Sequence, residues 1–242
     1  MNKRDLELLK RIGKEAIILD WEKAFSGKAK GNKHLFRVNK IARFLQKREG
    51  GNLFLILASA WVHDVSLAFG GIESEENIKR KTTQFLSKFN LTPIEIKKIA
   101  EYCSWHESGK KNIPIEAQII HDSDVIDKSG MLGFIRHVWK LTNILGGKVL
   151  SNKHDLKKVN EHLKVREKKV FTKTAKDIVK KLNIKRDEFF ENEKRSIMVM
   201  KQISSKAYRG INSDEITLFL INKTNASFRE ALVEQLGCRY LK

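Results

Sequence analysis

Apolar residues recur at helical spacing along most of the chain. The pattern is clearest over residues 33–47, where the apolar positions three or four residues apart are Leu35, Val38, Ile41 and Leu45. Only two prolines occur, and glycine pairs separate long segments of this pattern at 50–51, 70–71 and 146–147. We therefore predict a nearly all-α fold. The expected helices cover about residues 5–25, 33–47, 78–89, 92–106, 131–145, 175–190, 193–203, 213–221 and 227–236.

Capping residues mark two of the expected helix ends. Thr92 has the character of an N-cap, Pro93 of a first-turn residue, and Glu95 completes a capping box. The last expected helix is followed by Gly237, a common residue after a helix end. Because residues 204–212 have the composition of a linker, we predict one large domain over residues 1–205 and a small helical extension over 206–242.

The most apolar segment, residues 53–62, ends directly in His63 and Asp64. Ala and Ser among large aliphatic residues favour a buried helix, so this imidazole and this carboxylate arrive at its end largely removed from water. A buried carboxylate needs a hydrogen bond, an ion pair or a cation. Two interpretations are open: the two residues simply hydrogen-bond each other or cap the helix, or they belong to a divalent metal site.

Size and composition indicate an ordinary globular protein. The chain has 242 residues, 41% of them hydrophobic, and a charged start that does not resemble a signal peptide. The apolar segment before His63 has about half the length of a membrane crossing. Cys103 and Cys238 lie far apart and form no Cys-x-x-Cys pair. We expect no membrane association, a cytoplasmic location and reduced thiols.

Positive charge concentrates in one part of the chain. The formal net charge is +19, and residues 148–209 hold 19 Lys or Arg against 8 Asp or Glu, a local net charge of +11. Such a surface attracts polyanions and phosphorylated ligands. Lysines interleaved with apolar residues at helical spacing also form ordinary solvated faces, so nucleic-acid binding and a solvated face both remain open.

His63 and Asp64 gain significance from two other positions. His34 lies on the expected 33–47 helix, where it would otherwise be a core histidine. An acidic segment begins at Asp122. Two imidazoles and two carboxylates from three helices suit a six-coordinate divalent ion that keeps open positions for water and substrate.

This series of residues resembles the HD-domain metal-dependent phosphohydrolases, whose pattern is His, then His-Asp, then a distant Asp. One branch of that family, which includes nucleotide-acting hydrolases, has a His-x-x-Arg-Val motif, and residues 34–38 read His-Leu-Phe-Arg-Val. The same branch has an Asp-Ala-Asp-x-Leu-Asp-x-x-Gly-x-x-Gly-Ile-x-Arg stretch. Residues 122–136 keep its spacing as Asp-Ser-Asp-Val-Ile-Asp-Lys-Ser-Gly-Met-Leu-Gly-Phe-Ile-Arg. The resemblance covers about residues 30–145 strongly and implies an HD-type helical bundle.

The resemblance implies a ligand set and a reaction. Its metal ligands are His34, His63, Asp64 and Asp122, and the metal lowers the pKa of a bound water for attack on phosphorus. On a helix, Asp124 and Asp127 would point about 200° and 140° away from Asp122, so the three carboxylates cannot share one ion. We therefore favour pairing Asp124 with Lys128 and leave Asp127 to orient a ligand or line the pocket.

Three more residues are candidates for substrate contact. His106 matches a histidine of the family pattern and could contact phosphate or the leaving group, although capping a helix end is an equal alternative. Arg37 and Arg136 carry guanidinium groups suited to phosphate oxygens, with surface salt bridges as the alternative. The Gly-Lys that often follows His-Asp in the family is replaced here, and so is a Glu-Asp pair of the signalling-nucleotide hydrolases. The general acid is thus unassigned, and alarmone hydrolysis is disfavoured.

These features predict a metal-dependent phosphohydrolase. Its catalytic residues would be His106, Asp64 and Asp127, its substrate a small phosphorylated molecule with a nucleotide favoured, and its cofactor a divalent ion such as Mn, Co, Mg, Ni, Fe or Zn. The alternative is a nucleic-acid-binding or regulatory module in which the HD core is structural and the basic residues 148–209 act. The sequence decides neither the metal nor the oligomeric state.

Overall fold

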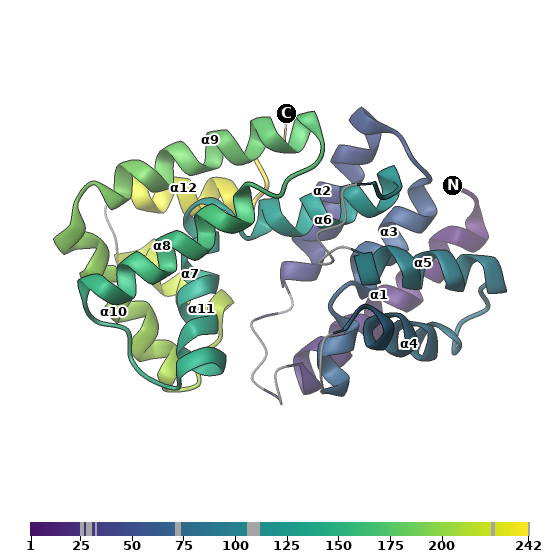
Figure 1. Ribbon diagram of the computed structural model, residues 1–242, viewed down its shortest axis with the longest axis horizontal. Helices are drawn as coiled ribbons and strands as arrows, with labels where there is room; N and C mark the ends of the chain where they lie inside the picture. The colour runs from purple at the N-terminus through teal and green to yellow at the C-terminus, as the bar shows by residue number, and fades with distance from the viewer. Residues whose placement is uncertain are drawn as a thin grey trace. The chain divides into compact units, whose positions relative to one another are not determined.

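The computed structural model describes residues 1–24, 27, 31, 33–70, 74–105, 112–223 and 226–241. These residues contain twelve α-helices and no strand, so the predicted all-α fold is confirmed (Figure 1). A 3-10 turn, η1, covers Val65–Phe69, and a π-helical turn, η2, covers Leu141–Gly146. The helices are α1 Lys3–Lys23, α2 Lys33–Glu49, α3 Leu53–Val62, α4 Glu75–Leu86, α5 Pro93–Trp105, α6 Ile115–Asp127, α7 Gly130–Lys140, α8 Lys153–Glu167, α9 Lys173–Phe190, α10 Glu193–Tyr208, α11 Ser213–Lys223 and α12 Ala226–Leu236. None of these helices is long and apolar enough to cross a membrane.

The contacts divide the chain into two compact units. Unit 1 comprises residues 1–124 and 171–175, and unit 2 comprises residues 125–170 and 176–242. The division falls near residues 124 and 176, whereas the sequence suggested a boundary at 205. Helices α11 and α12, predicted as a separate extension, pack against α7 within unit 2.

Unit 1 is organised around α3, the apolar segment that precedes His63. This helix packs against α1, α2 and α5, and eight of its ten residues are buried. Asn52 begins it as an N-cap, with its side chain accepting a hydrogen bond from the Leu55 N–H. The predicted buried helix is therefore present, and it ends at the two polar residues of interest. The capping box of Thr92 and Glu95 also forms at the start of α5.

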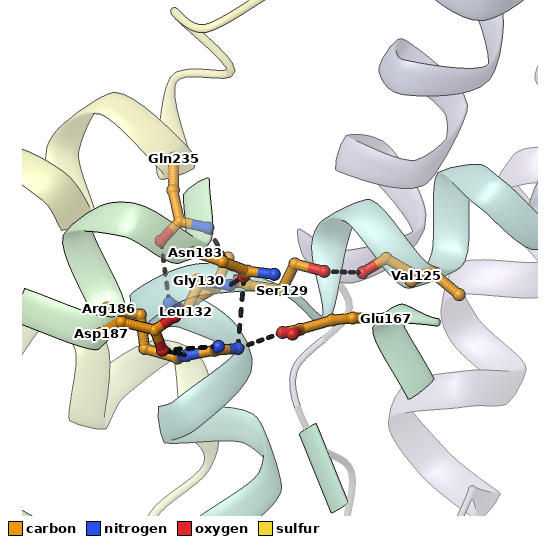
Figure 2. Close-up of polar contacts among 9 residues, drawn as sticks. All are labelled: Val125, Ser129, Gly130, Leu132, Glu167, Asn183, Arg186, Asp187 and Gln235. Carbon is orange, nitrogen blue, oxygen red and sulfur yellow. Dashed lines mark hydrogen bonds and ion pairs between the residues drawn. The ribbon is translucent and has the colours of Figure 1, made fainter. Parts of the chain in front are cut away.

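Unit 2 is organised around α7, which packs against α8, α10, α11 and α12. Its start is held by an amide from the far end of the chain. Gln235 donates to the Ser129 carbonyl at 2.9 Å and accepts from the Leu132 N–H at 3.0 Å (Figure 2). Asn183 accepts a third bond from the Gly130 N–H at 3.2 Å. Side chains of α9 and α12 thus accept hydrogen bonds from two N–H groups that a helix start leaves without intrahelical partners.

One predicted connection is helical instead. We expected a linker over residues 204–212, but α10 continues to Tyr208. Ile203, Ser204 and Ala207 are all fully buried, so this part of α10 contributes to the packing of unit 2. The Ser204 hydroxyl also accepts a hydrogen bond from the Leu150 N–H at 2.8 Å. Ser204, one of the polar residues that suggested a linker, is therefore part of this packing.

Candidate metal centre

Four buried side chains of unit 1 meet at one point. His34 is the second residue of α2, His63 and Asp64 directly follow α3, and Asp124 lies near the end of α6. His34 Nε2 lies 3.2 Å from His63 Nε2, 3.4 Å from Asp64 Oδ2 and 3.2 Å from Asp124 Oδ1. His63 Nε2 lies 3.5 Å from each of the two carboxylate oxygens. We call these four residues the His-Asp cluster.

The backbone of α3 fixes the orientation of one imidazole. His63 Nδ1 lies 2.9 Å from the Ala60 carbonyl oxygen, which can only accept a hydrogen bond. Nδ1 must therefore carry the proton, and in the neutral ring Nε2 presents its lone pair to the cluster. This second contact is the usual way in which proteins orient a metal-binding histidine.

The donor set fits a divalent metal ion. The exposed fractions are 2% for His34, 1% for His63, 8% for Asp64 and 3% for Asp124. Two carboxylates at this depth, facing two imidazole nitrogens, are costly without a cation. Imidazole nitrogen and carboxylate oxygen together suit first-row divalent ions. His63 does stand at the end of α3, as the capping interpretation expected, but its Nε2 faces His34 and Asp124 as well as the neighbouring Asp64.

Asp122, the fourth ligand in our prediction, faces a different neighbour. Its carboxylate accepts hydrogen bonds from the Phe171 N–H at 2.8 Å, the Thr172 N–H at 2.8 Å and the Thr172 hydroxyl at 2.7 Å. Burial raises the pKa of this carboxyl, and the three donated hydrogen bonds oppose that effect. Two positions apart on a helix, side chains point about 200° from each other, so Asp124 is the carboxylate of α6 that reaches the histidines.

Sequence alone did not distinguish these two aspartates as ligands. Helical geometry required them to face opposite sides of α6, but the side that meets the histidines depends on where residues 171 and 172 lie. That contact spans about fifty positions of the chain. The sequence indicated that only one of these two aspartates could join the histidines, and we predicted Asp122. The structure places Asp124 beside His34 and His63, while Asp122 accepts hydrogen bonds from residues 171 and 172.

A lysine from α4 supports the segment after Asp64. Lys81 is only 4% exposed, and its ammonium group donates to the carbonyl oxygens of Ser66, within η1, and Gly70, directly after it. The sequence lacks the lysine that often follows His-Asp in HD proteins, yet a lysine reaches that segment from another helix. In the sequence, Lys81 lies at helical spacing among Ile78, Thr82 and Phe85 on the buried face of α4, and this pattern could have indicated a buried lysine.

The other predicted residues are placed as follows. Arg37 is buried on α2, 5% exposed, one turn after His34. Asp127 and Arg136 are buried in unit 2, with Asp127 Oδ2 3.8 Å from Arg136 Nη1. His106 lies outside the described residues. The substrate-binding and catalytic functions of all four stay predictions.

Comparison with known proteins gives a consistent result. A model of the HD domain matches residues 32–129, which include the whole His-Asp cluster. An HD-superfamily hydrolase from Bacillus thuringiensis has a TM-score of 0.61 at 22% identity, over 79% of this chain and 97% of that chain. YpgQ of Bacillus subtilis has a TM-score of 0.57 at 18% identity, over 78% and 92%. Its complex with ADP gives 0.56 at 17%, over 79% and 94%.

At these identities the solved structures establish a shared fold. A search of curated proteins finds no match. The matched domain encloses the two histidines and two aspartates that converge in unit 1, in the order in which the HD pattern places such residues along a chain. The protein therefore contains an HD domain over residues 32–129.

Proposed function

We propose that the protein is a metal-dependent phosphohydrolase that acts on a small phosphorylated molecule. The observation that carries this proposal is the buried convergence of His34, His63, Asp64 and Asp124. The Nε2 atom of each histidine lies 3.2 to 3.5 Å from the other three donor atoms. We assign these four residues as the metal ligands, with Asp124 in place of Asp122. A divalent ion bound there would lower the pKa of a water molecule and polarise a phosphoryl oxygen.

The protein side chains have distinct tasks in this proposal. His63, held by the Ala60 carbonyl, presents Nε2 in a fixed direction. Asp64 and Asp124 supply negative charge, and their carboxylate oxygens can accept a hydrogen bond from a nearby water molecule. Lys81 holds the segment after Asp64 through two carbonyl contacts and so limits the movement of that carboxylate. Arg37, one turn from His34, is our candidate for binding a phosphate oxygen, and His106 is our candidate for the general acid.

A nucleotide is the substrate class that we favour. The motifs at residues 34–38 and 122–136 resemble those of nucleotide-acting HD hydrolases. A protein of similar fold, YpgQ, has been crystallised in complex with ADP. Neither observation identifies the bond that is cleaved, so the substrate screen must include both monoesters and anhydrides.

The direct test measures phosphate or pyrophosphate release from nucleoside mono-, di- and triphosphates with Mn²⁺, Co²⁺, Mg²⁺ or Ni²⁺. We expect activity only with an added or retained metal, about one ion per chain in the His-Asp cluster, and loss of both in His63→Ala, Asp64→Ala and Asp124→Asn. His154→Gln, an exposed histidine of α8, is the matched control and should retain both. Full activity of the metal-stripped protein would refute the proposal.

A further inference from the structure

A lysine-lined cleft lies in unit 2, outside the His-Asp cluster. It has a volume of about 330 Å³ and opens between the end of α8 and α9. Lys164 and Lys168 line it on one side, and Lys176 and Lys180 line it on the other. We call these four residues the lysine cleft. All four side chains are exposed.

The acidic side chains that line this cleft contact a buried arginine. Arg186 is 1% exposed and contacts Glu167 through Nη1 and Asp187 through Nε and Nη2, the last two bonds at 3.1 and 2.8 Å (Figure 2). Asn183 accepts a further bond from Nη1 at 3.2 Å. Both lining carboxylates are therefore oriented toward Arg186. With one arginine, two carboxylates and four lysines, the lining has a net charge of +3.

The lysines of the cleft differ from several ion-paired lysines of unit 2. Lys153, Lys157 and Lys185 form ion pairs with Glu193, Glu161 and Glu234. Within the described part of the chain, no ion pair of 4 Å or less involves Lys164, Lys168, Lys176 or Lys180. The four lysines therefore bring positive charge that no ion pair within the described residues compensates to one concave part of the surface.

The spacing of these lysines suits a repeating anion. The two lysines on each helix are four residues apart, which is one turn and about 6 Å along the helix axis. A flexible ammonium group contacts phosphate oxygens as a point charge and does not read base edges. Lysines on both sides of a cleft can contact a phosphate chain from two directions, whereas a flat bilayer surface reaches only the outer rim.

We propose that the lysine cleft binds the phosphodiester backbone of a nucleic acid without reading its base sequence. This function is separate from the His-Asp cluster and does not depend on the proposed hydrolysis. Binding of this type releases counterions, so the logarithm of the affinity falls linearly with the logarithm of the salt concentration, by about 0.9 per neutralised phosphate on duplex DNA. Four lysine contacts predict a slope near −3.6 from the cleft by the same relation.

Fluorescence anisotropy of the full-length protein with labelled duplex DNA, single-stranded DNA and RNA, titrated over a range of KCl concentrations, tests this proposal. The cleft variant replaces Lys164, Lys168, Lys176 and Lys180 by Gln. The control variant removes the same charge at ion-paired positions, by Gln at Lys148, Lys153, Lys157 and Lys185. Circular dichroism establishes that both variants are folded.

We expect the cleft variant to lose at least tenfold in affinity at low salt and about three units of salt slope, while the control variant stays within threefold of the wild type. Comparable binding of several sequences, and unchanged binding by Asp124→Asn, would support a separate, sequence-independent site. The three nucleic-acid arms identify which backbone form binds best. No binding at low salt, or equal losses in both variants, would overturn the proposal. Preferential binding to phosphatidylglycerol vesicles would overturn it in favour of a membrane surface.

Discussion

Asp122 and Asp124 are two residues apart on α6 and contact different parts of unit 1. Asp124 Oδ1 lies 3.2 Å from His34 Nε2, whereas both oxygens of Asp122 accept hydrogen bonds from residues 171 and 172. Asp122 therefore attaches a distant segment of the chain to α6. This contact is structural, and its loss should be visible in stability before it is visible in metal binding.

We predict that Asp122→Asn lowers the free energy of unfolding by about 1.5 to 3 kcal/mol, the typical effect of losing hydrogen bonds to a charged group. An amide has a single acceptor oxygen, and its NH₂ would face a backbone N–H of Phe171 or Thr172. Urea denaturation of the metal-free protein measures the change, and metal analysis of the same sample should show unchanged stoichiometry. Loss of metal from Asp122→Asn with unchanged stability would mean that Asp122 is a ligand after all.

His137 is a buried histidine of unit 2 with an unusual pKa. Its ring stacks on His162 at 3.9 Å between centroids and is 7% exposed. Burial lowers the pKa of His137 to about 3, and the positive charges of His162, Arg166 and Lys140 add to this effect. The folded protein therefore keeps His137 neutral at pH values where the unfolded chain, with a pKa near 6.5, binds a proton.

This difference predicts a loss of stability in acid. Between pH 6.5 and about 3 the unfolded state binds more protons, so stability falls as the pH falls, by up to about 1.4 kcal/mol per pH unit from this group. Chemical denaturation of the wild type and of His137→Phe at pH 7 and pH 5 measures the effect. The variant should show the shallower dependence, and His154→Gln, which alters an exposed histidine, should follow the wild type. Parallel pH profiles for all three proteins would contradict the assignment.

Three of the four cluster residues could be predicted from the sequence, and the reason is local. His63 and Asp64 follow an apolar run that had to be buried, and His34 belongs to a helix whose apolar face is readable from its spacing. Asp124 could not be chosen over Asp122, because that choice depends on the long-range contact with Thr172. Positions that follow from helical periodicity could be predicted from the sequence. A position that depends on a neighbour distant in the sequence could not.

At the scale of elements, the same distinction holds. The start of α5 follows from Thr92 and Glu95, since both capping contacts lie within four residues of each other. The length of α10 does not follow from its sequence, because Ser204 and Ala207 look like linker residues until their buried neighbours are known. Local capping predicted helix starts well, and buried small residues concealed one helix end.

Helices α11 and α12 are integral to the core of unit 2. Leu220 and Leu232 are fully buried in the cluster that includes Phe134, Val138 and Ile203. The amide of Gln235 also holds the start of α7 by two hydrogen bonds (Figure 2). A segment that supplies core leucines and a helix cap should contribute to stability as much as the elements it contacts.

We predict that Leu232→Ala lowers the free energy of unfolding by about 2 to 5 kcal/mol, as expected when a fully buried leucine leaves a cavity. Leu218→Ala, at a leucine of α11 that is 47% exposed, should cost much less. Denaturant unfolding followed by circular dichroism compares the two variants. Equal and small effects would show that α12 is a weakly attached extension, as the sequence suggested.

At the scale of the whole molecule, the chain crosses between the units more often than a linear reading suggests. Residues 171–175 belong to unit 1, although the preceding residues 125–170 belong to unit 2. The anchoring contacts are those of Asp122 with Phe171 and Thr172, together with Glu49 accepting from the Thr174 N–H at 3.0 Å. No change in composition marks residues 171–175 as part of unit 1. The sequence therefore indicated only a boundary near residue 205.

Because of this division, metal binding should stabilise one unit and not the other. All four residues that we assign as ligands belong to unit 1. A ligand that binds only the folded site stabilises it by about 2.7 kcal/mol at a free concentration one hundred times its Kd. Because the units have separate cores, opening reactions in unit 1 should be suppressed by the metal while those confined to unit 2 should not.

We predict that saturating Mn²⁺ slows amide hydrogen exchange in peptides from α2, α3 and α6, and leaves peptides from α10 and α11 unchanged. Hydrogen-exchange mass spectrometry with and without the metal measures this difference. His63→Ala should show no response in any peptide, because it removes a ligand whose Nε2 faces the other three donors. Equal protection of α10 and α11 would mean that both units open as one cooperative body, and protection of unit 2 alone would place the metal outside the His-Asp cluster.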